Sequence, residues 1–375
     1  MREFIDGAEA IARGALDAGC NFFAGYPITP ATPIMLRMLR ELPKVGGIGI
    51  QGEDEIASIG MCIGAAMTGA KTLTATSGPG ISLYSENIGM AIMGEVPLVI
   101  VDVMRLGPAT GGATTVSQGD VQFLRWVTSG GFPIIALCPS GLADCYTLTQ
   151  HAFNLAEKFR APVFIATDKE MMSAQQSVDT ATFEKIQPIN RVYASSAEEF
   201  VPYKIQHLSD TPAFAPVGGE HLIRFTTSMH DERGIITKKP ASVDHKGRHL
   251  AAKIEAHRDE LEFVKHDPQD GAHTLIVSYG ITARSMIQAA HNTRANGKRV
   301  STLIVQSLWP LPEKALRDAM RGITRVIVPE LNLGQYRLEI ERVAHARDPR
   351  PVVIGINRVD GELIEPEEIE AEIGD

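Results

Sequence analysis

KTLTATSGPGISLYSENIGMAIMGEVPLVIVDV, residues 71–103, has the pattern of a complete strand–helix–strand unit. KTLTAT (71–76) and PLVIVDV (97–103) are rich in β-branched and apolar residues, which predicts two buried strands. Residues 80–93 predict the helix between them, entered through the tight turn TSGPG. Because parallel strands need such a crossover, this unit predicts a parallel sheet covered by helices.

The same alternation continues on both sides of this unit. Residues 4–18 predict a helix closed by Gly19. Thr32 followed by Pro33 predicts the N-cap and first turn of a helix that ends near Leu42. The other expected elements are the strands NFFA (21–24), GGIGIQ (46–51), IIALC (134–138) and PVFIATD (162–168), and helices at 54–68, near 119–127 and from Ser140 to Arg160.

A polar stretch, residues 169–270, interrupts this rhythm. It contains an expected charged amphipathic helix at 247–265, and we interpret it as an excursion and linker. From residue 273 the alternation resumes in a second, smaller set. Its expected strands are HTLIVSYG (273–280), RVSTLIVQSL (299–308), RVIVPE (325–330) and PVVIGIN (351–357), with helices at 282–296, 312–321 and 334–345. The sequence therefore predicts an α/β fold with two doubly wound parallel-sheet domains.

Bulk composition argues against two classes of protein. The 375 residues are 44% hydrophobic and 22% charged, as in ordinary globular proteins. The net charge of −9 argues against a nucleic-acid binder, which would show a basic face. No apolar run reaches the roughly 18 residues of a membrane span, and MREFIDGAEAIARGAL lacks the apolar core of a signal peptide. We therefore expect a cytoplasmic protein without membrane contact.

The cysteines point to the same compartment. Cys20, Cys62, Cys138 and Cys145 form no C-x-x-C pair, and we interpret them as buried free thiols of a reducing cytoplasm. An iron–sulfur cluster held by this chain alone would need clustered thiolates, which the sequence lacks.

Three patterns that suggest other chemistry have simpler interpretations. GIGIQG (47–52) matches a dinucleotide fingerprint, but its glycines fall inside an expected strand. GAAMTGAKT (64–72) has one residue too many for a P-loop. His230, His245 and His249 suggest zinc, yet no supporting carboxylate pattern accompanies them, and we interpret them as surface histidines near the linker.

The acidic cluster QGEDEIASIG (51–60) has two interpretations. Asp54 fits the N-cap of the following helix, and Glu53 and Glu55 would favour its positive end. The same carboxylates stand at the carboxyl end of a parallel strand, where open α/β sheets bind ligands. TSGPG at another strand end suits an anion, and Arg105 at a third suits a carboxylate. Together these strand ends predict a ligand site.

Six motifs, read in order, resemble the alpha subunit of 2-oxoacid:ferredoxin oxidoreductases, and most closely the 2-oxoglutarate type. They are GYPITP, EDEIASIG, ATSGPG, SENIGMAIMGEVPLVIVDVMR, GPATGGATTVSQGD and VPELNLGQ, and the resemblance covers nearly the whole chain. It implies an enzyme that uses thiamine diphosphate. It also implies a pyrimidine-binding domain at 1–235, a linker or excursion at 236–270 and a transketolase C-terminal-like domain at 271–375.

The resemblance also implies roles for single residues. In this family a glutamate hydrogen-bonds N1′ of the thiamine aminopyrimidine and so promotes loss of the C2 proton. Glu55 fits this role best, and Glu53 is the alternative. Thr29 matches the active-site threonine on a turn that its prolines stiffen, and Arg105 matches an arginine that contacts the 2-oxoacid carboxylate.

Further site residues follow from the same resemblance. The expected cofactor contacts are Tyr26, Pro27, Glu53, Ser77, Gly78 and Asn87. The loop 106–118 would help to select the far end of the substrate, through Gly107, Thr110, Thr114 and Thr115. Asn332 and Gln335 would lie near the coenzyme A side or a subunit contact.

Two motifs of the family are absent from this sequence. There is no GDG…N motif for Mg²⁺ and diphosphate, since SQGD has no following Asn at the usual distance, and there are no cluster cysteines. We therefore expect Mg²⁺ and a [4Fe-4S] cluster on a separate beta subunit, no metal on this chain, and no activity from this chain alone. A separate gamma subunit stays open.

The expected reaction converts 2-oxoglutarate and coenzyme A to succinyl-CoA and CO₂, with electrons passed to ferredoxin. The sequence leaves open the same chemistry on a branched-chain or aromatic 2-oxoacid, the physiological direction and the electron acceptor. Two other classes are alternatives: a non-catalytic scaffold of a thiamine enzyme, and a nicotinamide dehydrogenase that uses GIGIQG.

Overall fold

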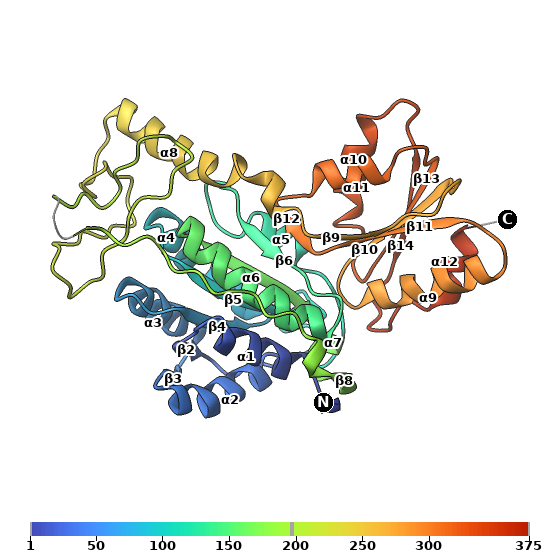
Figure 1. Ribbon diagram of the computed structural model, residues 1–375, viewed down its shortest axis with the longest axis horizontal. Coiled ribbons are helices and arrows are strands. Elements are labelled where there is room, and N and C mark those ends of the chain that lie inside the picture. The colour runs from blue at the N-terminus through green and yellow to red at the C-terminus, as the bar shows by residue number, and fades with distance from the viewer. Residues whose placement is uncertain (1, 196–198, 374–375) are drawn as a thin grey trace.

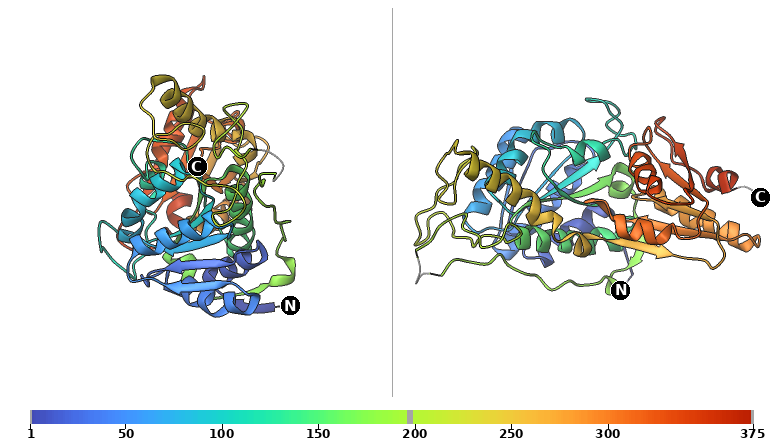
Figure 2. Two further views of the ribbon diagram at one scale, coloured as in Figure 1. Left: turned by 90° about the vertical axis from the view of Figure 1, so that its left-hand side faces the viewer. Right: turned by 90° about the horizontal axis from the view of Figure 1, so that it is seen from above.

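Two parallel-rich sheets, each covered by helices, form the two halves of the chain in a computed structural model that describes residues 2–195 and 199–373 (Figures 1 and 2). The first sheet has the order β12 (Ser307–Trp309), β6 (Ile135–Leu137), β7 (Pro162–Asp168), β5 (Leu98–Met104), β4 (Thr72–Thr76), β2 (Phe22–Gly25) and β3 (Ile48–Gln51). The second has the order β14 (Val352–Asn357), β13 (Arg325–Glu330), β10 (Thr274–Ser278), β11 (Val300–Val305) and β9 (Val264–Asp267). The α/β class with two wound sheets is confirmed.

Helices cover both faces of the first sheet, which explains its apolar strands. They are α1 (Gly7–Asp17), α2 (Thr32–Glu41), α3 (Glu55–Met67), α4 (Pro79–Met93), α5 (Val121–Arg125), α6 (Leu142–Phe159) and α7 (Lys169–Ser173). Val99 and Val101 of β5 join the core formed with α1, α2 and α6, whereas Ile100 joins the core formed with α3 and α4. β5 therefore contributes side chains to the cores on both faces of the sheet.

The helices α3 and α2 differ in how their N-termini are capped. Asp54 caps α3 as expected, because its carboxylate accepts the Ala57 N–H at 2.7 Å. The predicted cap at Thr32 is wrong: Thr32 is the first residue of α2, and Ala31 before it already has helical dihedrals. The N–H groups of Ala31 and Thr32 both bond to the Ile28 carbonyl, so the chain turns before Thr32 is reached.

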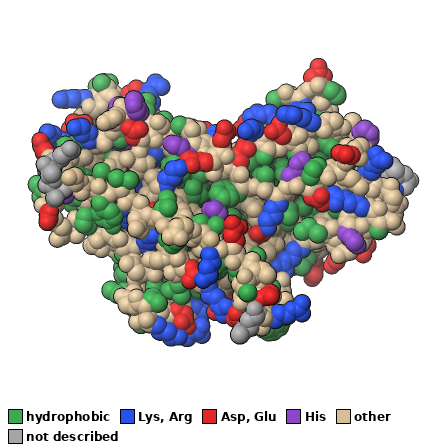
Figure 3. Space-filling view, viewed as in Figure 1, with side chains coloured by type: hydrophobic (Ala, Val, Ile, Leu, Met, Phe, Trp, Pro, Cys, Tyr) green, Lys and Arg blue, Asp and Glu red, His purple; other side chains and the backbone are tan. Residues whose placement is uncertain are grey.

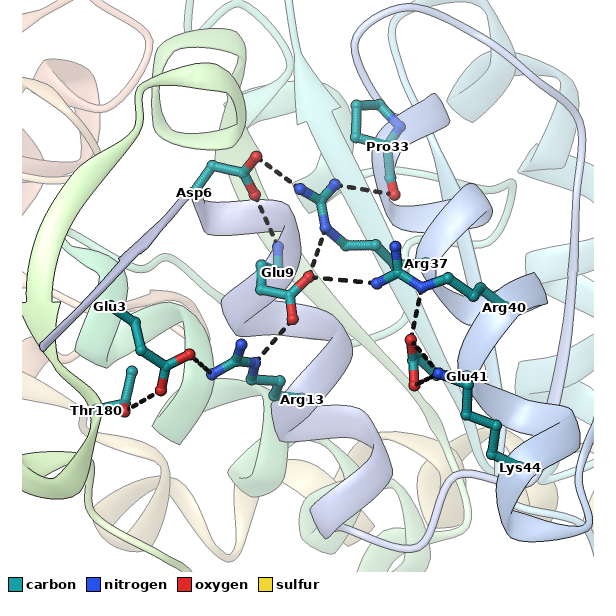
Figure 4. Close-up of polar contacts among 10 residues, drawn as sticks. All are labelled: Glu3, Asp6, Glu9, Arg13, Pro33, Arg37, Arg40, Glu41, Lys44 and Thr180. Atoms are coloured by element: carbon teal, nitrogen blue, oxygen red, sulfur yellow. Dashed lines mark hydrogen bonds and ion pairs between the residues drawn. The ribbon is translucent and has the colours of Figure 1, made fainter. Parts of the chain in front are cut away.

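The N-terminal segment also differs from the expected helix at 4–18. Residues 2–5 form β1 (Arg2–Ile5), which pairs with β8 (Gln176–Asp179), and α1 starts only after its cap Asp6. Arg37 of α2 donates to Asp6 at 2.7 Å and to Glu9 at 2.8 Å (Figure 4). This ion-pair cluster fixes α2 against α1 beside the first sheet.

Five further α-helices follow in the chain within the described residues. They are α8 (Pro240–Glu255), α9 (Thr282–Ala295), α10 (Glu313–Ala319), α11 (Arg337–His345) and α12 (Pro366–Ile373). The expected helix at 247–265 is shifted, because Pro240 starts α8 and the chain beyond Phe263 is bonded into a sheet. Strand β9, inside the stretch expected as a linker, pairs antiparallel with β11. Helix α12 was not foreseen.

One strand connects the two halves. β12 follows β11 in the chain but pairs antiparallel with β6 at the edge of the first sheet. Trp309 at its end is buried, and its indole N–H donates to the Val121 carbonyl at 2.9 Å. The second half is therefore attached to the first through main-chain pairing as well as side-chain packing.

Two of the three histidines interpreted as surface residues are buried. His249 donates through Nε2 to the Glu95 carboxylate at 3.0 Å, and His230 packs on Tyr203 with ring centroids 4.1 Å apart. Only His245 is exposed. His249 on α8 pairs with Glu95, a fully buried carboxylate between α4 and β5, whereas His230 lies before α8 and bonds to the Met93 carbonyl at 3.3 Å.

The surface and the thiols fit the composition. Lys, Arg, Asp and Glu side chains are interspersed over the face drawn in Figure 3. All four cysteines are free and buried. Within residues 2–195 and 199–373, no helix has the length and apolar content that crossing a bilayer requires.

Candidate active site

The strand order of the first sheet creates a switch point between β2 and β4. From β2 the chain proceeds to β3 on one side, and then returns to β4 on the other side of β2. In parallel α/β sheets, ligands bind at the carboxyl ends of strands at such a point. The segments that follow β2, β4 and β5 meet here, and they bring Thr29, Ser77 and Arg105 to one edge.

Arg105 joins two of these segments. It follows β5 directly and is 5% exposed. One terminal nitrogen donates to the Thr29 carbonyl at 2.5 Å, and the other donates to the Thr110 carbonyl at 3.1 Å. Its Nε has no acceptor among the described residues and lies 3.4 Å from where a Cβ on Gly78 would stand. Three of the five guanidinium donor hydrogens therefore remain unused by these bonds.

Glu55 points into the same edge from the start of α3. It is 7% exposed, and no group in the described chain donates a hydrogen bond to its carboxylate. A Cβ added at Gly80 would lie 3.0 Å from Glu55 Oε1 and 1.9 Å from Thr76 Oγ1. Only glycine fits there, so the backbone of α4 approaches the carboxylate closely. Glu53, by contrast, is exposed.

Several buried polar atoms at this edge have no hydrogen-bond partner in the part of the chain that the structure describes. They are Thr76 Oγ1, Ser77 Oγ, Arg105 Nε, Asp120 Oδ2, both carboxylate oxygens of Asp102 and Thr167 Oγ1. Buried polar groups in native proteins are normally paired, so a cluster of unpaired ones marks a place where another molecule or water binds. Thr76, Asp102 and Thr167 lie near the carboxyl ends of β4, β5 and β7, Ser77 and Arg105 follow β4 and β5 directly, and Asp120 precedes α5.

Sequence reasoning missed the two carboxyl groups in this cluster. Burial, and then the neighbouring Asp120 charge, raises the pKa of Asp102 well above its usual range. Burial raises the pKa of Asp120 to about 6, while the charge of Arg105 opposes the rise. The available signals were a charged residue inside the apolar strand PLVIVDV and the acid of SQGD, which was considered only as a diphosphate motif.

The loop after Arg105 is folded back on itself. The Leu106 N–H donates to the Thr115 carbonyl at 2.9 Å, and the Gly112 N–H donates to the Leu106 carbonyl at 2.8 Å. Gly111 has a φ of +46°, and a Cβ there would lie 1.8 Å from the Leu106 carbonyl oxygen. Gly107 and Thr114 are exposed on this loop, whereas Thr115 approaches Gly361 of the second half.

The remaining predicted residues lie around the same edge. Tyr26 and Pro27 stand on the turn after β2, where Tyr26 is exposed and Pro27 half-buried. Asn87 of α4 donates to the Ile56 carbonyl at 3.3 Å, which joins α4 to the start of α3. Asn332 and Gln335 reach this region from the second half, where Asn332 donates to the Gln118 carbonyl at 2.8 Å.

An apolar face borders the site on α3 and α4. Ile56 is 52% exposed and Leu83 47% exposed, and Met61 is exposed beside them. A Cβ added at Gly60 or Gly64 of α3 would meet open space. Within the described parts of the chain, no group of three or more His, Cys, Asp or Glu side chains is placed to hold a metal ion.

The family models match both halves of the chain. Residues 13–247 match the model described as pyruvate flavodoxin/ferredoxin oxidoreductase, thiamine diphosphate-binding. Residues 272–369 match the model of pyruvate:ferredoxin oxidoreductase core domain II.

Whole-chain comparisons give the same family. The chain is 41% identical to a 2-oxoglutarate synthase subunit KorA of Methanocaldococcus jannaschii, across 98% of both chains. It is 32% identical to a ketoisovalerate oxidoreductase subunit VorB of Methanothermobacter thermautotrophicus, across 97% of this chain and 94% of that relative.

A solved structure extends the comparison to the fold. The chain superposes with a TM-score of 0.91 and 31% identity on a 2-oxoglutarate:ferredoxin oxidoreductase from Magnetococcus marinus that has 2-oxoglutarate, coenzyme A and succinyl-CoA bound. The match covers 99% of this chain and 64% of that longer chain. With both family models matched in order, this chain belongs to the pyruvate flavodoxin/ferredoxin oxidoreductase family.

Proposed function

We propose that this chain is the alpha subunit of a thiamine-diphosphate-dependent 2-oxoglutarate:ferredoxin oxidoreductase. With its partners it converts 2-oxoglutarate, coenzyme A and oxidised ferredoxin to succinyl-CoA, CO₂ and reduced ferredoxin, in a reaction open to reversal. The observation that carries this proposal is the 41% identity to a 2-oxoglutarate synthase subunit over 98% of the chain. The geometry at the switch point of the first sheet supports it.

The residues at this edge fit one half of a thiamine site. Glu55 is a nearly buried carboxylate that receives no hydrogen bond from residues 2–195 and 199–373, as required of a group that bonds a ring nitrogen. The unpartnered Ser77 hydroxyl and the glycines Gly78 and Gly80 leave polar atoms and space beside it. Thiamine diphosphate supplies a nucleophilic carbon and stabilises the negative charge that decarboxylation leaves. Glu55 would hold the cofactor ring and relay its proton.

Arg105 and Thr29 would bind the substrate. Two backbone carbonyls hold the guanidinium, which keeps unused N–H groups, so it can donate to a substrate carboxylate without moving. Thr29 is exposed on the turn that Arg105 holds, and its hydroxyl would contact the substrate at the carboxyl ends of the strands. Gly107, Thr110, Thr114 and Thr115 on the folded-back loop would contact the far end of the 2-oxoacid.

The other half of the site would come from a beta subunit. The exposed apolar face of α3 and α4, with Ile56, Met61 and Leu83 around the open glycines, suits a close helix contact with that subunit. We place Mg²⁺, the [4Fe-4S] cluster and the ferredoxin contact on the beta subunit, and leave a gamma subunit open. The four buried free thiols favour the cytoplasm.

The experiment is a substrate comparison with the assembled complex. The chain and its beta subunit are co-produced and assayed with 2-oxoglutarate, 2-oxoisovalerate and an aromatic 2-oxoacid, each with coenzyme A and a viologen dye. We expect the highest kcat/KM for 2-oxoglutarate. A higher value for 2-oxoisovalerate would favour the second candidate, which rests on the 32% identity to a ketoisovalerate oxidoreductase subunit. Absence of any turnover would favour a scaffold.

A further inference from the structure

The substrate loop returns to the first sheet through contacts with the second half of the chain. The Ser117 hydroxyl donates to the Leu331 carbonyl at 2.9 Å, and the Gln118 N–H donates to the same carbonyl at 2.8 Å. Gln118 is fully buried, and its Oε1 accepts from Thr282 at 3.1 Å and from the Leu331 N–H at 3.2 Å. The end of this loop therefore depends on residues that follow it by more than 150 positions.

Asn332 makes the most complete of these contacts. Its Nδ2 donates to the Gln118 carbonyl and to the Tyr279 hydroxyl, both at 2.8 Å. Its Oδ1 accepts from the Gly334 N–H at 2.9 Å and from the Gln335 N–H at 2.8 Å. The side chain is 2% exposed, and all four of its hydrogen-bonding positions are occupied inside the chain. None is left over for a coenzyme.

Gln335 holds the next residues of the loop. Its Nε2 donates to the Gly119 carbonyl at 2.6 Å, and its Oε1 accepts the Gln122 N–H at 2.9 Å. The Gln122 side chain returns a bond to the Gln335 carbonyl at 2.9 Å. These contacts bracket Asp120, the acid whose charge interacts with Arg105.

The turn that presents Asn332 and Gln335 is itself rigid. The Glu330 carboxylate accepts from the Tyr279 hydroxyl at 2.8 Å, and from the backbone N–H groups of Tyr336 and Arg337 at 3.0 Å each. Glu330 is fully buried at the end of β13. A carboxylate with three donors fixes both ends of the 331–336 turn.

We propose that Asn332 and Gln335 are positioning residues for the substrate loop. They form a loop clamp with Gln118, Gly119 and Gln122, and this clamp holds Asp120 and Arg105 in the arrangement that binds the 2-oxoacid carboxylate. The second half of the chain thereby sets the affinity for the 2-oxoacid without touching it. This inference rests on the proposed function for the identity of the ligand.

The clamp predicts a particular kinetic signature. When a binding-competent loop is only partly populated, the apparent dissociation constant rises by the inverse of that fraction. Saturating substrate restores the ordered loop, so turnover at saturation is retained. Weakening the clamp should therefore raise KM for the 2-oxoacid with little change in kcat, whereas general destabilisation would lower both activity and the amount of assembled complex.

The test uses Gln335→Met in the assembled complex, because methionine keeps the length and volume of the side chain but removes its hydrogen bonds. We expect KM for 2-oxoglutarate to rise about tenfold, the effect of about one net hydrogen bond, with kcat within about twofold of wild type. Amide hydrogen exchange of residues 106–120, measured without substrate, should become faster. Gln288→Met is the matched control, since Gln288 is exposed on α9 and its side chain bonds to Asn292 on the same helix.

A second variant protects the test against misfolding. Thr282→Val removes one isosteric hydroxyl bond to Gln118 and should give smaller changes in KM and in exchange, in the same direction. Unchanged exchange in both variants, or a fall in kcat at constant KM, would overturn the clamp. If the wild-type complex turns over no 2-oxoacid, the proposed function fails, and the exchange measurement alone decides the clamp.

Discussion

Two buried charged clusters lie at opposite edges of the first sheet and are built in opposite ways. Around Glu95, before β5, Lys246 donates at 2.6 Å, Lys253 at 2.7 Å, and His249 lies at 3.0 Å, so the carboxylate is fully paired. Around Arg105, after β5, an arginine nitrogen, two carboxyl groups and several hydroxyls lack partners. The paired Glu95 cluster stabilises the fold, whereas the unpaired groups around Arg105 are typical of a ligand site.

The pKa values express the same difference. Burial would raise the pKa of Glu95, but Lys253 and Lys246 hold it well below its ordinary range. At the other edge, burial raises the pKa of Asp120 to about 6. Glu95 therefore stays ionised at neutral pH. Burial also lowers the pKa of Lys253 to about 8, although the charge of Glu95 opposes this fall. In the second cluster, burial makes the ionised form of Asp120 unfavourable.

The largest expected effect tests the unpaired edge. Glu55→Ala in the assembled complex should lower turnover about 100- to 10,000-fold, because a general acid–base group at the cofactor is lost. Assembly with the beta subunit should survive. Glu53→Ala is the matched control and should retain near wild-type activity, since Glu53 is exposed. Retained activity in Glu55→Ala, measured by viologen reduction, would remove this residue from the mechanism.

The next effect tests the paired edge. Glu95→Gln should destabilise the fold by about 3–5 kcal/mol, because it leaves Lys246 and Lys253 buried without a counter-charge. Urea denaturation measures this loss. Asp244→Asn, which breaks the exposed pair with Arg248, is the control and should cost about 0–1 kcal/mol. Equal losses in the two variants would show that the Glu95 cluster has no special structural role.

A conservative change at Arg105 should act on binding rather than on the fold. Arg105→Lys keeps the positive charge but loses the planar fork that bonds Thr29 and Thr110 together. We expect KM for 2-oxoglutarate to rise roughly 10- to 100-fold, the loss of about 1.5–3 kcal/mol for bonds to a charged group. Steady-state kinetics with several 2-oxoacids measure it. An equal rise for substrates and for coenzyme A would contradict a role at the 2-oxoacid carboxylate.

The smallest effect is on stability and has the opposite sign. The pKa of Asp120 is raised when folded, so this residue stabilises the fold only while protonated, and that contribution is lost as the pH rises from about 4 through about 6. The difference in free energy of unfolding between Asp120→Asn and wild type should therefore shift by about 1–2 kcal/mol in favour of the variant from pH 4 to pH 8. Denaturation at the two pH values checks this. A difference that does not change with pH would contradict a destabilising charge at Asp120.

The fold was predictable where its causes are local. Strand–helix alternation, the Asp54 cap and the buried cysteines follow from neighbouring residues, and the structure agrees with them. The cap at Thr32 failed because the Ile28 carbonyl turns the chain earlier. β9 was missed, and β12 was predicted only as the end of the strand at 299–308, because their pairing partners lie far away in sequence and β12 joins the other half's sheet.

The site was predictable only through spacing and resemblance. Asp102 lies inside the apolar strand PLVIVDV, and Asp120 is part of SQGD, which resembles a fragment of a diphosphate motif. The contacts that hold His230 and His249 inside are with Met93 and Glu95, which precede them by more than 130 residues and give no local signal. Likewise, the loop clamp joins residues about 210 positions apart, and no periodicity records such contacts.

The central claim is that Glu55 belongs to half of a shared thiamine site. A structure of the complex with its beta subunit and thiamine diphosphate tests it directly. We predict a Glu55 carboxylate oxygen within about 2.6–3.2 Å of N1′ of the aminopyrimidine, with Glu53 turned to solvent. A cofactor ring bound away from Glu55, whether or not it contacts Glu53, would contradict the account.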